Sequence, residues 1–175
     1  MPRPIPSTLI SASQISDRIT ELAADISKDY AETDSLVVVG VLTGSFVFLA
    51  DLVREVDLDL EVEMMAVMSY GAATKSSGQV RLIMDLQRDI RDRDILVVED
   101  IVDTGRTLNY LLGNLGHREP KSIRVCTLLD KPSRREVEAK PDYVGFEIPD
   151  KFVVGYGLDH AQRYRGLPYI AVLGE

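Results

Sequence analysis

The sequence holds a single cysteine, Cys126, among its 175 residues. One thiol cannot build a disulfide framework or a paired-cysteine metal site, so both are excluded as the basis of this fold. Cys126 lies in the apolar run Val125–Leu129, and free cysteines are among the residues most often buried. We therefore interpret Cys126 as a thiol inside a buried strand.

Basic residues are also scarce relative to acidic ones. The chain has 20 lysines and arginines against 28 aspartates and glutamates, a formal net charge of -8. This balance disfavours nonspecific binding to nucleic acid or to an anionic membrane, and we expect neither as a partner. A polyphosphate substrate would have to be attracted by local arginines and lysines, by helix ends or by bound metal ions.

Long apolar segments are missing as well. No apolar run approaches the roughly 20 residues that a membrane span needs. The first residues, Met1–Ser7, contain three prolines and no apolar stretch of the kind found in a secretory signal. These features predict a cytoplasmic location.

What the chain does have is enough apolar material for a core, 45% of its residues, in a length that suits one domain spanning 1–175. Continuous apolar runs, typical of strands buried on both faces, alternate with segments of helical spacing. The expected strands are Leu36–Leu42, Asp59–Tyr70, Gln79–Met84, Asp94–Val98, Ser122–Leu129, Asp142–Glu147 and Val153–Leu158, and the expected helices are Ser13–Tyr30, capped by Ser13 or Ser16, Phe46–Val53 and Thr107–Leu115. This alternation predicts an α/β domain with a largely parallel central sheet flanked by helices.

The segment from Ile95 to Thr107 carries the strongest chemical signal. A buried strand runs into the acid pair Glu99-Asp100, and Asp103 then precedes a Thr-Gly-x-Thr turn that opens a helix. The amides of such a turn and the helix N-terminus form an anion site suited to a terminal phosphate. The neighbouring acids would repel phosphate unless they contact a sugar diol and its magnesium ion, since hard cations prefer oxygen ligands. The alternative is that Asp103 or Thr104 simply caps the helix.

Several other segments, in the same order along the chain, strengthen this signal. They are Val39–Ser45, Ser69–Gly71, Leu128–Pro132, Val144–Asp150 and Phe152–Asp159. With the strand, acid pair and phosphate turn, they make the chain resemble the class I phosphoribosyltransferases, in particular the hypoxanthine-guanine branch, over nearly all of residues 36–170. The resemblance implies that family's fold, with a small hood and a mobile lid loop. It also implies purine salvage: transfer of the phosphoribosyl group from phosphoribosyl pyrophosphate to hypoxanthine and guanine, releasing IMP or GMP and pyrophosphate, with Mg²⁺ as cofactor.

The resemblance implies a role for each matching residue around the sugar. Glu99 and Asp100 would hold the ribose hydroxyls, directly or through magnesium-bound water. Asp103 would be the general base at purine N7. The 5-phosphate loop would consist of Asp103, Thr104, Gly105, Arg106 and Thr107.

The purine site that the resemblance implies lies further along the chain. Lys131 would donate to the 6-oxo group, Phe152 would stack on the purine and the Val153 backbone would contact its edge. Asp159 belongs to the same site and would help to hold a second magnesium ion on the pyrophosphate. The implied metal residues are therefore Glu99, Asp100 and Asp159.

The pyrophosphate site implied in this way comprises Thr43, Gly44 and Arg165, with Arg163 as a competitor for the last role. The family commonly has lysine or arginine where this chain has Thr43, so the backbone N–H groups of that loop are the expected pyrophosphate donors. Ser69 and Tyr70 would lie on the lid, followed by the small polar loop Gly71–Gly78. The resemblance also implies a homodimer or homotetramer.

Some alternatives stay open on the sequence alone. Another enzyme of the same fold could prefer xanthine or pyrimidines; Lys131 with Phe152-Val153 favours a 6-oxopurine but does not rank hypoxanthine, guanine and xanthine. A noncatalytic nucleotide- or RNA-binding regulator of this fold is disfavoured by the acidic charge and by Asp103. Arg134 and Arg135 either face the substrate or form a solvated pair, and His117 and His160, without a partner cluster, are interpreted as structural or exposed.

Overall fold

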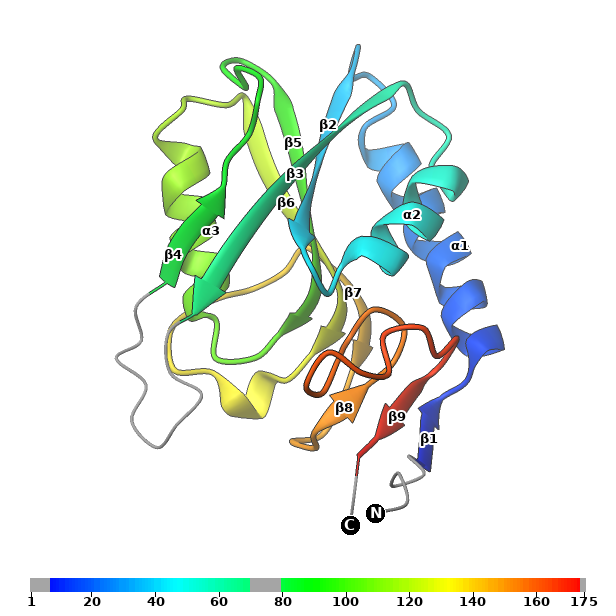
Figure 1. Cartoon of the computed structure of the whole chain (residues 1–175). Helices are drawn as coiled ribbons and strands as arrows, with labels where there is room; N and C mark the ends of the chain where they lie inside the picture. Colours follow the sequence, from blue (N-terminus) through cyan, green and yellow to red (C-terminus); the bar gives the residue numbers. More distant parts are fainter. Residues whose placement is uncertain (1–6, 70–79, 174–175) are drawn as a thin grey trace.

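The computed structural model describes residues 7–69 and 80–173. Its centre is a six-stranded sheet of order β4-β3-β2-β5-β6-β7 (Figure 1). The strands are β2 (Leu36–Leu42), β3 (Leu60–Ser69), β4 (Val80–Met84), β5 (Asp94–Val102), β6 (Ser122–Asp130) and β7 (Tyr143–Glu147). Strand β4 pairs antiparallel with β3, and the other neighbours run parallel. The predicted α/β architecture is confirmed.

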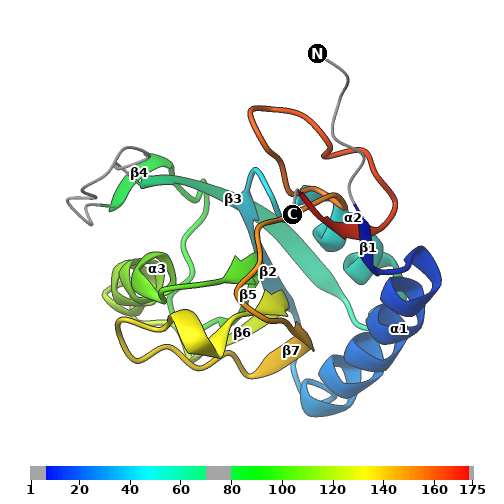
Figure 2. The same cartoon turned by 90° about the horizontal axis from the view of Figure 1, so that it is seen from below.

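Helices cover both faces of this sheet. Helices α1 (Ala12–Asp29) and α2 (Phe46–Glu55) lie on one side, and α3 (Arg106–Gly116) lies on the other (Figure 2). Alternate residues of β5 supply the two core layers, because side chains of a strand point to opposite faces in turn. Leu96 and Val98 pack on the α1 and α2 side, whereas Ile95 and Val97 pack on the α3 side. This double burial explains why the central strands read as unbroken apolar runs.

A second, antiparallel sheet of order β1-β9-β8 lies near the carboxyl ends of the central strands (Figure 1). It consists of β1 (Ser7–Ile10), β9 (Ile170–Val172) and β8 (Val153–Val154). The sequence analysis missed β1 and extended β8 too far, to Leu158. The strand stops because Gly155, Tyr156 and Gly157 have φ values of 100°, 49° and 100°, which turn the chain. This small sheet is the hood over the central one.

Helix ends differ from the sequence prediction in an informative way. Ser11 caps α1 in a reciprocal capping box with Gln14, so the predicted caps Ser13 and Ser16 are wrong. Helix α3 begins after Gly105, which has φ 86° and provides no side-chain cap. Asp103 therefore does not cap α3, and its carboxylate is available for another purpose.

Other expectations can be checked in the same structure. Cys126 is fully buried within β6, as predicted. His117 is exposed at the end of α3, where its ring contacts the Gly113 carbonyl. Over the described ranges, no helix combines the length and apolar character needed to cross a membrane. Tyr70 and the loop Gly71–Gly78, predicted as a lid, lie outside the described residues.

The Tyr30 hydroxyl yields a first testable prediction. Tyr30 ends α1 and is buried, and its hydroxyl is the one buried side-chain polar atom without a hydrogen-bond partner among the residues that the structure describes. Removing an unpaired buried hydroxyl removes a desolvation cost, so Tyr30→Phe should keep or raise the free energy of unfolding, by about 1 kcal/mol. Denaturant titration measures this change.

Tyr143 provides the matched control. Its hydroxyl donates to Asp29 at 2.7 Å and accepts from Arg124 at 2.8 Å. Tyr143→Phe should therefore lower the free energy of unfolding by about 1–2 kcal/mol, because two charged partners lose a hydrogen bond. Equal losses in both variants would contradict the assignment of Tyr30 as unpaired.

Candidate active site

The carboxyl edge of the central sheet contains a cavity of about 600 Å³. Strands β2 and β5 end at this cavity, as expected for ligand sites of parallel sheets. Its lining includes ten of the residues predicted for the site: Thr43, Gly44, Glu99, Asp100, Asp103, Thr104, Gly105, Thr107, Asp159 and Arg165. The acid pair and the turn at Gly105 were expected here from the local sequence pattern, whereas Thr43, Gly44, Asp159 and Arg165 were expected from the family resemblance; the structure brings these residues together around one cavity.

The backbone of the loop after β2 approaches Asp100 of the acid pair closely at Gly44. A Cβ atom at Gly44 would lie 1.6 Å from Oδ2 of Asp100, so only glycine leaves room for that carboxylate. Oδ1 of Asp100 accepts a hydrogen bond of 2.7 Å from the Ile101 amide. The Leu42–Thr43 peptide bond of this loop is cis. The carboxylate thus faces the cavity beside the backbone of the glycine loop.

A second glycine brings the chain after β8 to the same place. A Cβ atom at Gly157 would lie 2.2 Å from the Gly44 carbonyl oxygen, and the φ of Gly157 is 100°. The following residues Asp159 and Arg165 pair through Nη2 and Oδ1 at 2.9 Å, and Arg165 Nη1 donates to the Gly157 carbonyl at 2.7 Å. Arg163, the competitor of Arg165, is exposed and is not part of the cavity lining.

The turn from Asp103 to Thr107, predicted as a phosphate loop, joins β5 to the start of α3. Gly105 has a left-handed backbone, and helix α3 starts directly after it, so Thr107 and Leu108 of its first turn, whose amides lack an intrahelical acceptor, line the cavity. The Arg106 amide donates to the Thr104 hydroxyl at 3.4 Å. The Arg106 side chain points elsewhere: its Nε donates to Glu136 at 2.6 Å, and both side chains are half exposed. Any contribution of Arg106 to an anion site therefore comes from its backbone.

Burial perturbs the two acids at the end of β5. Burial raises the pKa of Glu99 well above its ordinary value, and the neighbouring charge of Asp100 adds to the effect. Burial likewise raises the pKa of Asp100 to about 6, with Asp159 adding to the shift, while the Ile101 amide and Arg165 oppose it. Perturbed carboxylates in a cavity are typical of functional sites.

This arrangement predicts a pH-dependent effect of Asp100→Asn on stability. Because the folded state binds the Asp100 proton more tightly than the unfolded state, the wild-type free energy of unfolding falls as pH rises from about 4 to about 6. The neutral amide escapes this cost. Asp100→Asn should therefore be more stable than the wild type by about 1–3 kcal/mol at pH 8, with most of the gain lost at pH 4.5. Denaturant unfolding without divalent cations measures it, and a gain that does not change with pH would contradict the assignment.

Of the predicted purine residues, Asp159 lines the cavity, whereas Lys131, Phe152 and Val153 are not part of its lining. Lys131 is buried, and its Nζ donates to the Lys151 carbonyl at 2.6 Å and lies 3.9 Å from Oδ1 of Asp150. Phe152 leaves 55% of its surface exposed, which suits a stacking platform. The His160 ring meets it edge-on at 5.4 Å between centroids. Val153 is buried as the first residue of β8.

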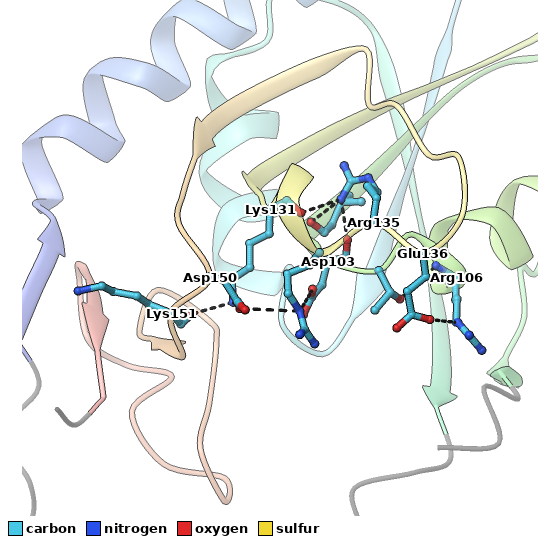
Figure 3. A network of polar contacts seen from close by, with 10 residues as sticks. Asp103, Arg106, Lys131, Arg135, Glu136, Asp150 and Lys151 are labelled. Atoms are coloured by element: carbon cyan, nitrogen blue, oxygen red, sulfur yellow. Dashed lines mark hydrogen bonds and ion pairs between the residues drawn. The ribbon is translucent and has the colours of Figure 1, made fainter. Parts of the chain in front are cut away.

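Figure 3 shows the polar network that joins this purine side to Asp103. Nε of Arg134 lies 3.2 Å from Oδ1 of Asp103 and 3.7 Å from Oδ1 of Asp150. Arg135 instead braces the main chain: its Nη1 donates to the carbonyls of Val102 and Asp103 at 3.0 and 2.7 Å. The sequence analysis had left both arginines open and had not singled out Asp150. In the sequence, the adjacent Arg134 and Arg135 were the feature that could have indicated this network.

The protein side chains alone do not form a complete set of metal ligands in the described part of the chain. In the described part of the chain, no group of three or more histidine, cysteine, aspartate or glutamate side chains is close enough to hold an ion. Glu99, Asp100 and Asp159 are thus not a closed protein cage. Of the predicted lid residues, Ser69 ends β3, and the structure describes its backbone only.

Comparison with known proteins identifies the family. The family described as phosphoribosyl transferase domain matches residues 9–161 of the chain. The chain belongs to the phosphoribosyltransferase family. Within this family it is similar to the hypoxanthine-guanine phosphoribosyltransferase of Bacillus subtilis, at 50% identity over 99% of this chain and 96% of the relative. The hypoxanthine phosphoribosyltransferase of Haemophilus influenzae is 54% identical over 93% of this chain and 92% of its own.

Solved structures place this phosphoribosyltransferase in the same branch. A crystal structure of a hypoxanthine-guanine phosphoribosyltransferase from Bacillus anthracis superposes with a TM-score of 0.91 at 45% identity, covering 97% of this chain and 99% of the other. A hypoxanthine phosphoribosyltransferase of Trypanosoma cruzi gives 0.92 at 40% identity, covering 99% and 94%. The family resemblance that the sequence motifs indicated is confirmed.

Proposed function

We propose that this phosphoribosyltransferase serves purine salvage, transferring the 5-phosphoribosyl group from phosphoribosyl pyrophosphate to hypoxanthine and guanine. The observation that carries the proposal is the cavity in which the acid pair Glu99-Asp100 directly adjoins the glycine turn at Gly105. One wall offers oxygen acceptors to a sugar diol, and the other offers amides to a phosphate, as a ribose 5-phosphate requires. The 50% and 54% identities to enzymes named for hypoxanthine support the choice of base.

The sugar and its 5-phosphate are positioned by residues on both sides of the acid pair. Glu99 and Asp100 hold the ribose hydroxyls. The amides and hydroxyls of Thr104, Gly105 and Thr107 hold the 5-phosphate, with the Arg106 amide as a further donor. Because the main chain at Asp103 is braced by Arg135, the loop is preorganised before substrate binds.

The pyrophosphate leaves past the loop after β2. Backbone N–H groups around Thr43 and Gly44 donate to it, and the Arg165 guanidinium stabilises its developing charge. Asp159 orients Arg165 through the 2.9 Å ion pair. Because Thr43 cannot supply a positive charge, we assign that role to Arg165, which lines the cavity.

Carboxylates of this cavity fit a magnesium cofactor. Mg²⁺ is usually held by one or two carboxylates with waters and substrate phosphates, which agrees with the open set of Asp100, Glu99 and Asp159. The raised pKa values of Glu99 and Asp100 support this assignment, because a bound cation would compensate the charge of two buried neighbouring carboxylates. When bound, the ion would neutralise charge on the diphosphate oxygens.

Different residues contact the six-membered ring and the five-membered ring of the purine. Lys131 Nζ donates to the 6-oxo group, and Phe152 stacks on the ring. The Val153 backbone and Asp159 contact the edge of the purine. N9 forms the new bond to ribose C1 as the C1–oxygen bond to pyrophosphate breaks. The proton on N7 passes to the carboxylate of Asp103, which is the general base in this scheme.

Water must be excluded during this step, because it would capture a cationic ribose. We assign Ser69 and Tyr70 to a lid that closes over the cavity. We further propose that the chain forms a single domain over 1–175, is located in the cytoplasm, and assembles as a homodimer or homotetramer. The solved structure of the Trypanosoma cruzi relative concerns the role of the C-terminal region in the oligomeric state and activity of that enzyme.

The decisive experiment offers the protein phosphoribosyl pyrophosphate, Mg²⁺ and one base at a time, and follows nucleotide formation. We expect product with hypoxanthine and guanine. Product with xanthine alone would move the chain to a different branch of the family, and no product with any purine would overturn the proposed activity.

A further inference from the structure

Arg134 lies between two carboxylates that come from different loops. It belongs to the single turn η1 (Pro132–Arg134), which follows β6, and its amide donates to the Lys131 carbonyl at 3.0 Å. Its Nε lies 3.2 Å from Oδ1 of Asp103 and 3.7 Å from Oδ1 of Asp150. Lys131 Nζ reaches the same oxygen of Asp150 at 3.9 Å. The four side chains thus form one chain of alternating charge, of which Figure 3 labels Asp103, Asp150 and Lys131.

Stability does not account for this arrangement. The side chains of Arg134, Asp103 and Asp150 are 47%, 42% and 55% exposed. Ion pairs this accessible contribute little to the free energy of unfolding, because water already solvates both partners and ordering the side chains costs entropy. The position of Arg134 therefore calls for another explanation.

The geometry around Asp103 supplies that explanation. Arg135 fixes the main chain by donating to the Asp103 carbonyl at 2.7 Å. What remains adjustable at Asp103 is the rotation of its side chain, and Arg134 restrains it by holding Oδ1. A single contact on Oδ1 leaves Oδ2 able to accept a proton.

We propose that Arg134 is a positioning residue for the general base: it holds the Asp103 carboxylate in the orientation that accepts the N7 proton, and Asp150 holds Arg134 in turn. The inference rests on the proposed function of Asp103. Asp150 also adjoins Lys131, so the two residues assigned to neighbouring atoms of the purine, N7 and the 6-oxo group, are held by one network.

Arginine suits this position better than lysine does. Its planar guanidinium approaches from a fixed direction with Nε, whereas a lysine ammonium is a strongly hydrated charge on a flexible stem. Arg134→Lys should therefore keep the charge but restore the orientation of Asp103 only in part.

The test measures the rate of nucleotide formation in a single turnover, with enzyme in excess over hypoxanthine, since this rate separates chemistry from product release. Arg134→Ala should slow this rate about tenfold, as expected when a reacting group loses its alignment. Arg134→Lys should fall between Arg134→Ala and the wild type. The dissociation constant of phosphoribosyl pyrophosphate should change less than about twofold, because Arg134 lies outside the donor site.

A double-mutant comparison separates positioning from a general structural effect. If Arg134 acts through Asp103, adding Arg134→Ala to Asp103→Asn should slow the reaction less than about twofold further, because the base is already lost. Arg91→Gln is the matched control. Arg91 is also an accessible arginine in an ion pair, with its side chain 63% exposed and Nη1 3.0 Å from Oε2 of Glu119, and it lies in the loop that enters β5 at the opposite edge of the sheet. It should leave the rate unchanged.

Each outcome decides the question. A single-turnover rate of Arg134→Ala within twofold of the wild type overturns the inference, as does the same tenfold loss in the Asp103→Asn background. A rate faster than wild type also overturns it, since Arg134 would then mask the base. If the wild type itself makes no nucleotide, the proposed function fails instead, and the two failures are distinguishable.

Discussion

Replacing Asp103 with asparagine is expected to slow nucleotide formation by about 100-fold or more while leaving the affinity for phosphoribosyl pyrophosphate nearly unchanged. The amide has the shape of the carboxylate and can still accept a hydrogen bond from Arg134 through its oxygen, but it cannot take up the N7 proton. The loop should survive the change, because Gly105 and Arg135 hold its backbone and the Asp103 side chain does not cap α3.

Two measurements check this expectation. Single-turnover kinetics with hypoxanthine report the chemical step, and equilibrium titration with phosphoribosyl pyrophosphate and Mg²⁺ reports donor binding. Asp103→Glu serves as a second variant, since it keeps a proton acceptor but displaces it by one methylene. If Asp103→Asn loses rate and donor affinity equally, Asp103 supports the phosphate loop rather than accepting a proton.

Gly44→Ala should abolish donor binding although it adds only one methyl group. The new Cβ would lie 1.6 Å from Oδ2 and 2.6 Å from Cγ of Asp100. No φ value demands glycine here, so the damage is steric: the Asp100 carboxylate has to leave the position in which the Ile101 amide holds it. A displacement of about 1 Å at a reacting site can cost about 100-fold, and we expect at least that loss in affinity for phosphoribosyl pyrophosphate.

Gly113→Ala is the control for this substitution. Gly113 lies within α3, and a Cβ atom there meets no atom within 4 Å. Alanine in an open helical position should raise the free energy of unfolding by about 0.5–1 kcal/mol and leave donor binding intact. Wild-type donor affinity in Gly44→Ala would show that Asp100 does not contact the ribose from its present position.

The positions of the site residues were predictable where local rules apply. An apolar run leads into Glu99-Asp100, and a glycine precedes the next helix, so both the acids and the phosphate turn could be recognised from consecutive residues, although β5 continues past the acid pair to Val102. The helix α1 and its buried stripe followed from periodicity, although its cap at Ser11 was missed because two nearby serines offered the same chemistry. Strand β1 was missed because its four residues acquire their meaning only by pairing with β9, at the far end of the chain.

The α/β class, the apolar strands and the acid pair next to a phosphate turn could be predicted without the structure, because each of these depends on residues a few positions apart. Tertiary structure alone decided the order of the strands, the contact of Gly44 with Asp100, and the link from Lys131 through Asp150 and Arg134 to Asp103. These features join segments that are distant in the chain. Local propensity does not encode such distances, since they are fixed only when the sheet and both of its helical layers pack together.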